Sequence, residues 1–335
     1  MKKTALTISL VVALIAAFGL VNNFSKGLNT VFGQSGGKNH HNDDGKENDP
    51  EAMDVDHHIN PRGAKVGLAL TTGGTAKTTA ITNHGGPVIT GTIGIYIIWY
   101  GNWNQTNGSD NATGQQIVRD FCNNIGNSPY FNINQSYTGV TGSVLFRGET
   151  TDSGTSKRLT DNNIQTIVKN SITSGRLPYD ANGIYFLLTS SDVTASSGFC
   201  TQYCGWHTYA NATSTLGKIR YSFVGNANRC LTSCAAQSTS PNGNPGVDGM
   251  LSVLAHELEE AASDPDLNAW YDSAGAENAD KCAWTFGHFQ FQAPNGSWAN
   301  VTLGSRNYLI QRNLYHNLNF GGIIGDYCMM DATHN

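Results

Sequence analysis

Apolar positions along the chain fall into continuous runs and runs with helical spacing. Continuous β-branched and aromatic runs at residues 93–100, 184–189 and 219–224 predict strands that are buried on both faces. Apolar positions three and four residues apart at residues 114–126 and 160–172 predict helices. This order of elements predicts a mixed α/β fold, in which a mixed β-sheet is layered with helices.

Shorter patterns complete this outline. Residues 131–138 and 143–147 are expected to form two more strands. Thr160 or Asp161 is expected to cap the helix at residues 160–172, because both side chains can accept a hydrogen bond from the first helical N–H groups. No repeat of 20–50 residues is visible, so we expect residues 84–335 to form a single domain.

The N-terminal segment indicates a secreted protein. Lys2 and Lys3 precede an apolar run over residues 5–21, and this order is typical of a secretory signal, which we place at residues 1–33. The alternative is an uncleaved anchor helix, and this segment would then be the only expected contact with a membrane. Residues 34–83 contain few large apolar side chains and are expected to be a polar, flexible lead-in.

Composition and charge narrow the class of protein. The chain has 335 residues, of which 13% are charged, and its formal net charge is −5. Its 13 Tyr, 13 Phe and 6 Trp can build a core, so disorder along the whole chain is excluded. With 20 Lys and Arg against 25 Asp and Glu, we expect no nucleic acid partner.

The cysteines are also consistent with a secreted protein in an oxidising compartment. Two C-x3-C pairs could be zinc ligands in a cytosolic protein, but disulfides are expected after a signal peptide. Six cysteines allow fifteen pairings. We expect the two C-x3-C segments to be bridged to each other and the last two cysteines to pair, with Cys122 as a buried free thiol; the six others are Cys200, Cys204, Cys230, Cys234, Cys282 and Cys328.

The segment GVDGMLSVLAHELEEAASDPD carries the candidate chemistry. It predicts a helix with Asp248 as N-cap and an end before Pro265. His256 and Glu260 lie one turn apart on one face, opposite a broad apolar face, and Glu257 flanks them. We therefore expect His256 and Glu260 to face an open cleft.

This spacing resembles the H-E-x-x-H helix of zinc hydrolases, with a glutamate at the fifth position. Carboxylate oxygen is an acceptable zinc ligand, so His256 and Glu260 are candidate metal ligands and Glu257 is the candidate general base. Glu277 and Asp280 follow 21 or more residues after His256 and are the candidates to complete the site. Zinc is the expected cofactor, and another divalent cation would also fit. The alternative is an ordinary helix with solvated His and Glu side chains.

Other histidines carry a weaker signal. His207 follows Cys204 and Trp206, and we expect a core or disulfide-loop histidine there rather than a ligand. Nothing in the spacing of His288 or His316 requires either one to approach the site.

Several segments in order resemble the EXORDIUM (phosphate-induced protein) family of secreted proteins. The likeness runs from about Gly86 to Cys328 and is carried by GPVITGTIGIYIIWYGNW, FCTQYCGWH, YSFVGNANRC, the HELEE helix with NAWYD, and ENADKC. The resemblance implies an extracellular or cell-wall location and, in plants, a link to growth and nutrient signalling. The chain departs from the plant pattern at Glu259 and Asp264, which replace less acidic residues, and in its polar lead-in.

Two functions remain open at this point. The first is a secreted metal-dependent hydrolase that acts on a peptide or another amide. The second is a non-catalytic extracellular or cell-wall-associated signalling or binding module with a structural metal site. A peptide or a cell-wall component is the expected partner in either case.

Overall fold

The computed structural model describes residues 58–59, 80–211 and 217–333. The expected signal segment lies outside these residues and stays a prediction. Most of the expected lead-in also lies outside them. Its described residues include two short strands, β1 (His58–Ile59) and β2 (Thr82–Asn83).

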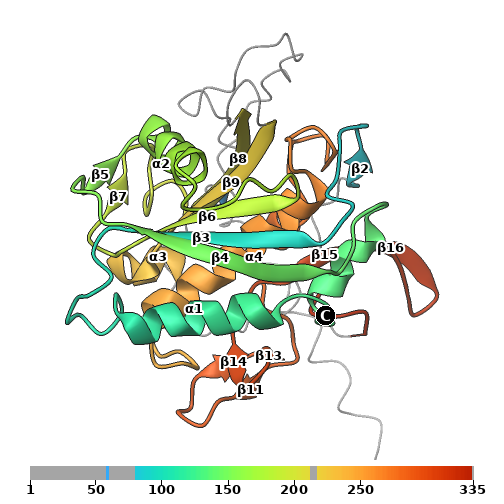
Figure 1. The fold of residues 1–335 in the computed structure, drawn as a ribbon. Helices are drawn as coiled ribbons and strands as arrows, with labels where there is room; N and C mark the ends of the chain where they lie inside the picture. The colour runs from blue at the N-terminus through green and yellow to red at the C-terminus, as the bar shows by residue number, and fades with distance from the viewer. Residues whose placement is uncertain (1–57, 60–79, 212–216, 334–335) are drawn as a thin grey trace, which may run out of the picture. The chain divides into compact units, whose positions relative to one another are not determined.

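A six-stranded mixed sheet organises the domain, in the order β1-β8-β9-β6-β3-β4 (Figure 1). Strands β4, β3, β6 and β9 are parallel, while β8 is antiparallel to β9 and β1 is antiparallel to β8. The bounds of the long strands are β3 Ile93–Tyr100, β4 Val144–Asp152, β6 Gly183–Thr189, β8 Gly205–Asn211 and β9 Lys218–Gly225. The mixed α/β fold expected from the sequence is confirmed.

Helices cover both faces of this sheet. In Figure 1, α2 (Asp161–Thr173) lies above the sheet, while α1 (Ala112–Asn124) and α4 (Pro245–Ser263) lie below it. The Thr160 side chain caps α2 by accepting a hydrogen bond from Asn163 N at 3.1 Å. The one-turn helix α3 (Leu231–Cys234) follows the 3₁₀ turn η4 (Ala227–Arg229). The central strands are buried on both faces, as the continuous apolar runs predicted.

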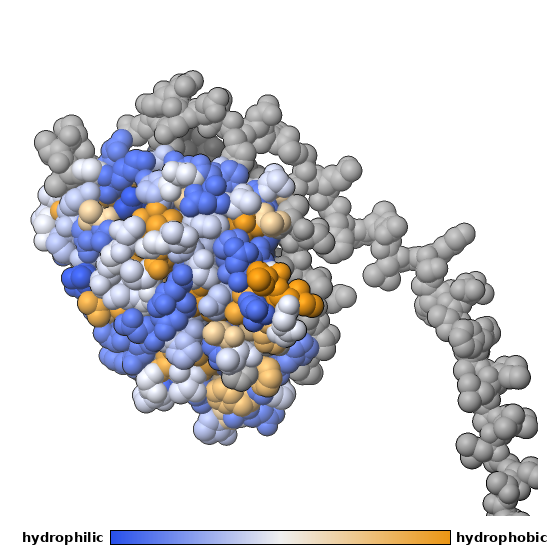
Figure 2. Space-filling view, turned by 90° about the vertical axis from the view of Figure 1, so that its right-hand side faces the viewer, coloured by the Kyte–Doolittle hydropathy of each residue, from blue (hydrophilic) through white to orange (hydrophobic). Residues whose placement is uncertain are grey.

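Short hairpins and turns surround the sheet. Their pairs are β2 with β10 (Trp270–Tyr271), β5 (Arg158–Leu159) with β7 (Thr194–Ala195), β11 (Phe291–Gln292) with β12 (Trp298–Ala299), β13 (Val301–Leu303) with β14 (Arg306–Tyr308), and β15 (Asn313–Phe320) with β16 (Ile323–Met329). The face that includes the β15–β16 side is mostly hydrophilic with scattered hydrophobic patches (Figure 2). Exposed apolar side chains gather at the turn of this last hairpin, at Phe320, Ile323 and Ile324.

One expected strand is wrong and another strand was not predicted. Residues 131–138 were expected to form a strand, but Phe131–Ser136 form the 3₁₀ helix η3, whose first residue donates its N–H to Ser128 Oγ at 3.1 Å. The buried Asn134 side chain also donates to Phe131 O, and such local bonds favour a turn over a strand. Strand β8 was missed, because the segment before it reads as a disulfide loop.

The expected disulfide pattern is confirmed. Cys200 pairs with Cys230, Cys204 with Cys234, and Cys282 with Cys328. Cys122 is the buried free thiol, and burial raises its pKa. Among the residues that the structure describes, no helix is long and apolar enough to cross a bilayer.

Candidate metal centre

Helix α4 positions the candidate residues. It begins at Pro245, where proline needs no N–H partner, and Asn244 caps it by accepting a hydrogen bond from Val247 N at 3.2 Å. The expected cap, Asp248, lies inside the first turn instead, and its carboxylate accepts hydrogen bonds from the backbone and side chain of Asn242. The helix ends at Ser263, before Pro265, as predicted.

The polar face of α4 packs against the sheet, so the expectation of an open cleft is wrong. His256 is 1% exposed and Glu257 is fully buried. Gly205 on β8 makes this close packing possible. A Cβ added there would lie 2.5 Å from Val253 Cγ1 and 3.1 Å from Glu257 Oε1. A larger residue at this position would therefore force the helix away from the strand.

One group of donors forms around His256. Its Nε2 lies 3.0 Å from Glu260 Oε1, one helical turn later, and 3.5 Å from Asp280 Oδ1. Asp280 begins the 3₁₀ turn η5 (Asp280–Cys282), and its backbone N–H donates to Glu260 Oε1 at 3.0 Å. The loop beyond β10 thus brings Asp280 to the helix, and its role as a metal ligand stays a prediction.

A second group forms around His207 on β8. Its Nε2 lies 3.0 Å from Glu277 Oε2 and 3.8 Å from Glu260 Oε2. Glu277 therefore joins His207 rather than His256. Ligand atoms of His207, Glu257 and Glu260 lie within 4.8 Å of one another, and so do those of His256, Glu260 and Asp280. Glu260 belongs to both groups.

His207 was expected to be a core or disulfide-loop histidine rather than a ligand. It is buried, but the sequence did not indicate that it contacts Glu277 and Glu260. Recognition of β8 would have supplied the signal, because side chains alternate across a strand and His207 then points to the opposite face from Trp206. His316 lies apart from the cluster and pairs with Asp326 at 2.9 Å. His288 belongs to neither metal-compatible group in the described part of the chain.

Buried polar atoms face one another in this cluster without hydrogen bonds. Both carboxylate oxygens of Glu257 and Oε2 of Glu260 are buried and have no hydrogen-bond partner in the described structure. The same holds for both ring nitrogens of His256, because the close approach of Nε2 to Glu260 lacks hydrogen-bond geometry. A buried polar group without a partner is costly, and a buried charge is more so.

The charges explain why this arrangement needs a cation or protons. Burial and the neighbouring Glu260 carboxylate raise the pKa of Glu257 well above its ordinary value. Burial likewise raises the pKa of Glu260 to about 7, although His256 lowers it. Burial lowers the pKa of His256, but the carboxylates of Glu260 and Asp280 outweigh this effect and hold the pKa well above its ordinary value. A bound divalent cation would favour the charged carboxylates and the neutral imidazoles.

The donor set is compatible with such an ion. Imidazole nitrogen and carboxylate oxygen are both ordinary zinc ligands, and a set this rich in carboxylates also suits harder divalent cations. His256, Glu260 and Asp280 could hold one ion, and His207, Glu257 and Glu277 lie beside them. Glu259 is also buried, but it belongs to neither of these groups.

Comparisons with known proteins give a consistent picture. The phosphate-induced protein 1 conserved region matches residues 81–308, which include the whole cluster. EXORDIUM-like 3 of Arabidopsis thaliana is 35% identical over 282 residues, which cover 71% of this chain and 81% of that protein. EXORDIUM-like 5 of the same plant is 33% identical over 269 residues, which cover 68% and 72%. PHOSPHATE-INDUCED 1 of Nicotiana tabacum is 27% identical over 235 residues, covering 59% and 70%. No solved structure matches the chain.

Proposed function

Because this chain belongs to the phosphate-induced protein 1 family, which includes the EXORDIUM-like proteins, we propose that it is a secreted domain built around a buried divalent cation. The single observation that carries the metal proposal is the convergence of ligand atoms from β8, α4 and η5 to within 4.8 Å of one another, in two groups that share Glu260. Both oxygens of the fully buried Glu257, a member of one group, accept no hydrogen bond. Zinc is the cation that the mixture of imidazole and carboxylate donors favours.

The closed surroundings support a structural role for this ion. His256 and Glu257 are 1% and 0% exposed, and even the Asp280 side chain is only 13% exposed. A substrate would have to displace part of the packing between α4 and β8 to reach them. The ion would join β8, α4 and the loop that holds Glu277 and Asp280, three segments that are distant in the sequence. In this role it stabilises the folded domain.

The order of residues on α4 favours a second candidate, a metal-dependent hydrolase. Glu257 follows one candidate ligand, His256, and precedes the other, Glu260, as the general base does in zinc hydrolases of this type. A bound cation would make water a stronger nucleophile at neutral pH. Glu257 would then accept a proton from that water, and a peptide or another amide is the proposed substrate. This second function requires α4 and β8 to move apart far enough for the substrate to reach Glu257.

Glu257→Gln separates the two candidates. Both expect a cation in the purified protein. The structural role expects that neither the parent protein nor the variant hydrolyses a peptide library. If the protein is a hydrolase, the parent protein should cleave peptides of the library. The Glu257→Gln variant should then lose this activity while it still binds the cation. Glu259→Gln is the matched control, because it changes a neighbouring buried carboxyl that lies outside both groups of donors.

Three disulfides among the described residues support the proposal of secretion, because such bonds persist in oxidising compartments. The N-terminal segment with Lys2, Lys3 and the apolar run at residues 5–21 supplies the proposed signal. Expression of the full chain in a secretory host tests this. Recovery from the medium with one free thiol per chain supports secretion, whereas retention inside the cell with seven free thiols contradicts it.

A further inference from the structure

A second site of interest lies where the parallel strands end, away from the candidate metal centre. From β3 the chain passes through α1 to β4 on one side, and then through α2 to β6 on the other side of β3. The strand order therefore reverses between β3 and β6. In open α/β sheets, ligands bind outside the carboxyl ends of the strands at such a reversal.

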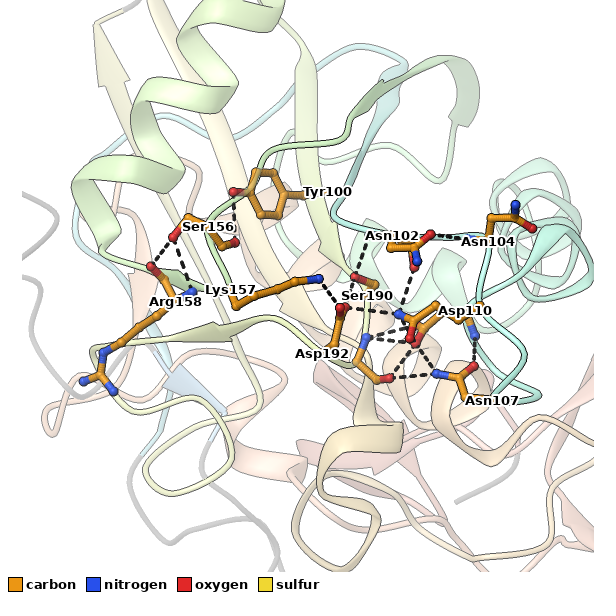
Figure 3. A network of polar contacts seen from close by, with 12 residues as sticks. Tyr100, Asn102, Asn104, Asn107, Asp110, Ser156, Lys157, Arg158, Ser190 and Asp192 are labelled. Carbon is orange, nitrogen blue, oxygen red and sulfur yellow. Dashed lines mark hydrogen bonds and ion pairs between the residues drawn. The ribbon is translucent and has the colours of Figure 1, made fainter.

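The loops at this edge are tied together by Asp110, which is fully buried. Its carboxylate accepts hydrogen bonds from Ser191 N at 3.0 and 3.1 Å, from Ser191 Oγ at 2.5 Å and from Asn226 Nδ2 at 2.7 Å. Ser191 follows β6 and Asn226 follows β9, while Asp110 itself lies between β3 and α1. Asn107 and Gln105 also donate hydrogen bonds to Asp110, and Figure 3 labels Asp110 and Asn107 in this network. The loops are thus held in place before any ligand arrives.

An open cavity of about 730 Å³ adjoins this network. Its walls include Ser191, Thr194, Asn228 and the arginines Arg158 and Arg229. Cavities of this volume are typical of sites for small molecules. The Cys200–Cys230 disulfide joins two walls of this cavity, because Cys200 lines it and Cys230 directly follows Arg229. A bond at that place limits how far the walls can move apart.

The charge of these walls is positive, although the whole chain has a net charge of −5. Asp192, the carboxylate that lines the cavity, is already paired with Lys157 and accepts a hydrogen bond from Ser190 Oγ. Within the described residues, Arg158 and Arg229 form no ion pair, and Arg229 Nη1 donates a hydrogen bond to Ser191 O at 3.3 Å. In Figure 3 the Arg158 side chain extends away from the network around Asp192, so its guanidinium is left for other partners.

We propose that this cavity binds an acidic saccharide, a sugar that carries a carboxylate or a phosphate group. Guanidinium groups form paired hydrogen bonds with both of these anions. The Thr194 hydroxyl and the Asn228 amide suit the hydroxyl groups of a sugar. This proposal does not depend on the metal centre, since no residue of the cavity belongs to that cluster.

Isothermal titration calorimetry on the full purified chain tests the proposal. The probes are a galacturonate trisaccharide, glucose 6-phosphate, the neutral trisaccharide maltotriose and inorganic phosphate. We expect at least one acidic sugar to bind at least tenfold more tightly than maltotriose and inorganic phosphate, and the better of the two distinguishes a carboxylate from a phosphate ligand. Equal binding of acidic and neutral sugars would overturn the proposal, and so would binding of inorganic phosphate as tight as that of the sugars.

Arginine variants locate the binding. Arg158→Gln and Arg229→Gln should each weaken binding of the acidic sugar about tenfold or more, since a hydrogen bond to a charged group contributes at least about that factor. Arg147→Gln is the control, because Arg147 is also exposed but lies on β4, outside the cavity walls. Both cavity arginines are exposed, so these variants should fold normally. Unchanged affinity in both variants, or an equal loss in the control, would overturn the proposal.

Discussion

Two fully buried carboxylates, Asp110 and Glu257, have opposite surroundings. Asp110 accepts hydrogen bonds from backbone and side-chain donors of the loops around it, and those donors stabilise its charge. Glu257 accepts none and lies beside Glu260 and other acidic groups. Burial alone therefore does not mark a functional carboxylate. The absence of donors, together with the gathering of like charges, marks the cluster on α4 as a candidate cation site.

Removal of the cation should give the largest effect. The proposed ion joins three segments of the fold, so its removal with a chelator should lower the free energy of unfolding by about 4 kcal/mol, the value for a ligand at about 1,000 times its Kd. For a domain of this size that corresponds to a fall in Tm of about 10 °C. Differential scanning calorimetry with and without EDTA measures it, and added zinc should restore the Tm. An unchanged Tm after treatment with EDTA would contradict the claim that a cation stabilises the cluster on α4, in contrast to the region around Asp110.

Asp110→Ala should give a smaller loss of stability that does not involve the ion. It leaves the N–H of Ser191 and one of the two side-chain N–H groups of Asn226 without an acceptor, at a cost of about 2–3 kcal/mol. Urea unfolding measures this cost. The content of bound metal should equal that of the parent protein, and a loss of metal in this variant would contradict the separation of the two sites.

The pH dependence of the metal-free protein should be opposite to that of the loaded one. The pKa of Glu260 is about 7 in the folded protein and lower when unfolded, so only the folded state holds this proton between pH 4.5 and 7. The stability of the metal-free protein should therefore fall as pH rises through this window, by on the order of 2 kcal/mol. Metal affinity should rise over the same window, because the ion competes with protons. Chemical denaturation at several pH values with EDTA measures the first trend, and a rise in stability would contradict it.

Glu259→Gln should have the smallest effect. Burial raises the pKa of Glu259 well above its ordinary value, although the nearby Tyr130 hydroxyl lowers it, and a raised pKa favours the neutral carboxyl. Replacement by an amide of nearly the same shape should then change the free energy of unfolding by less than about 1 kcal/mol. Metal analysis should find the ion retained, whereas Glu260→Gln should lose it. A loss of metal in Glu259→Gln would contradict this prediction and indicate that Glu259 is part of the metal site.

The sequence predicted most of the sheet and part of the cluster, for physical reasons that differ. Strands such as β3 are continuous apolar runs, which only a doubly covered sheet can bury. His256 and Glu260 lie on one helix, so their proximity follows from the helical repeat. His207 could not be paired with Glu277 in the same way, because that contact depends on how β8 packs against the rest of the fold.

The sequence also could not predict that the polar face of α4 is buried. A polar stripe on a helix normally faces solvent. Here Gly205 lets α4 approach β8, and no local pattern reveals that contact. Likewise, η3 was mistaken for a strand because its turn depends on side-chain bonds of Ser128 and Asn134.

The metal content of the purified full chain tests the central claim most directly. We would measure zinc and other divalent cations per chain by inductively coupled plasma mass spectrometry, in the parent protein and in His256→Ala, with Asp110→Asn as the control for a buried site that needs no ion. The account predicts at least one divalent cation per chain in the parent protein and the control, and its loss in His256→Ala. A parent protein without metal after purification in zinc-containing buffer, or full metal content in His256→Ala, would contradict it.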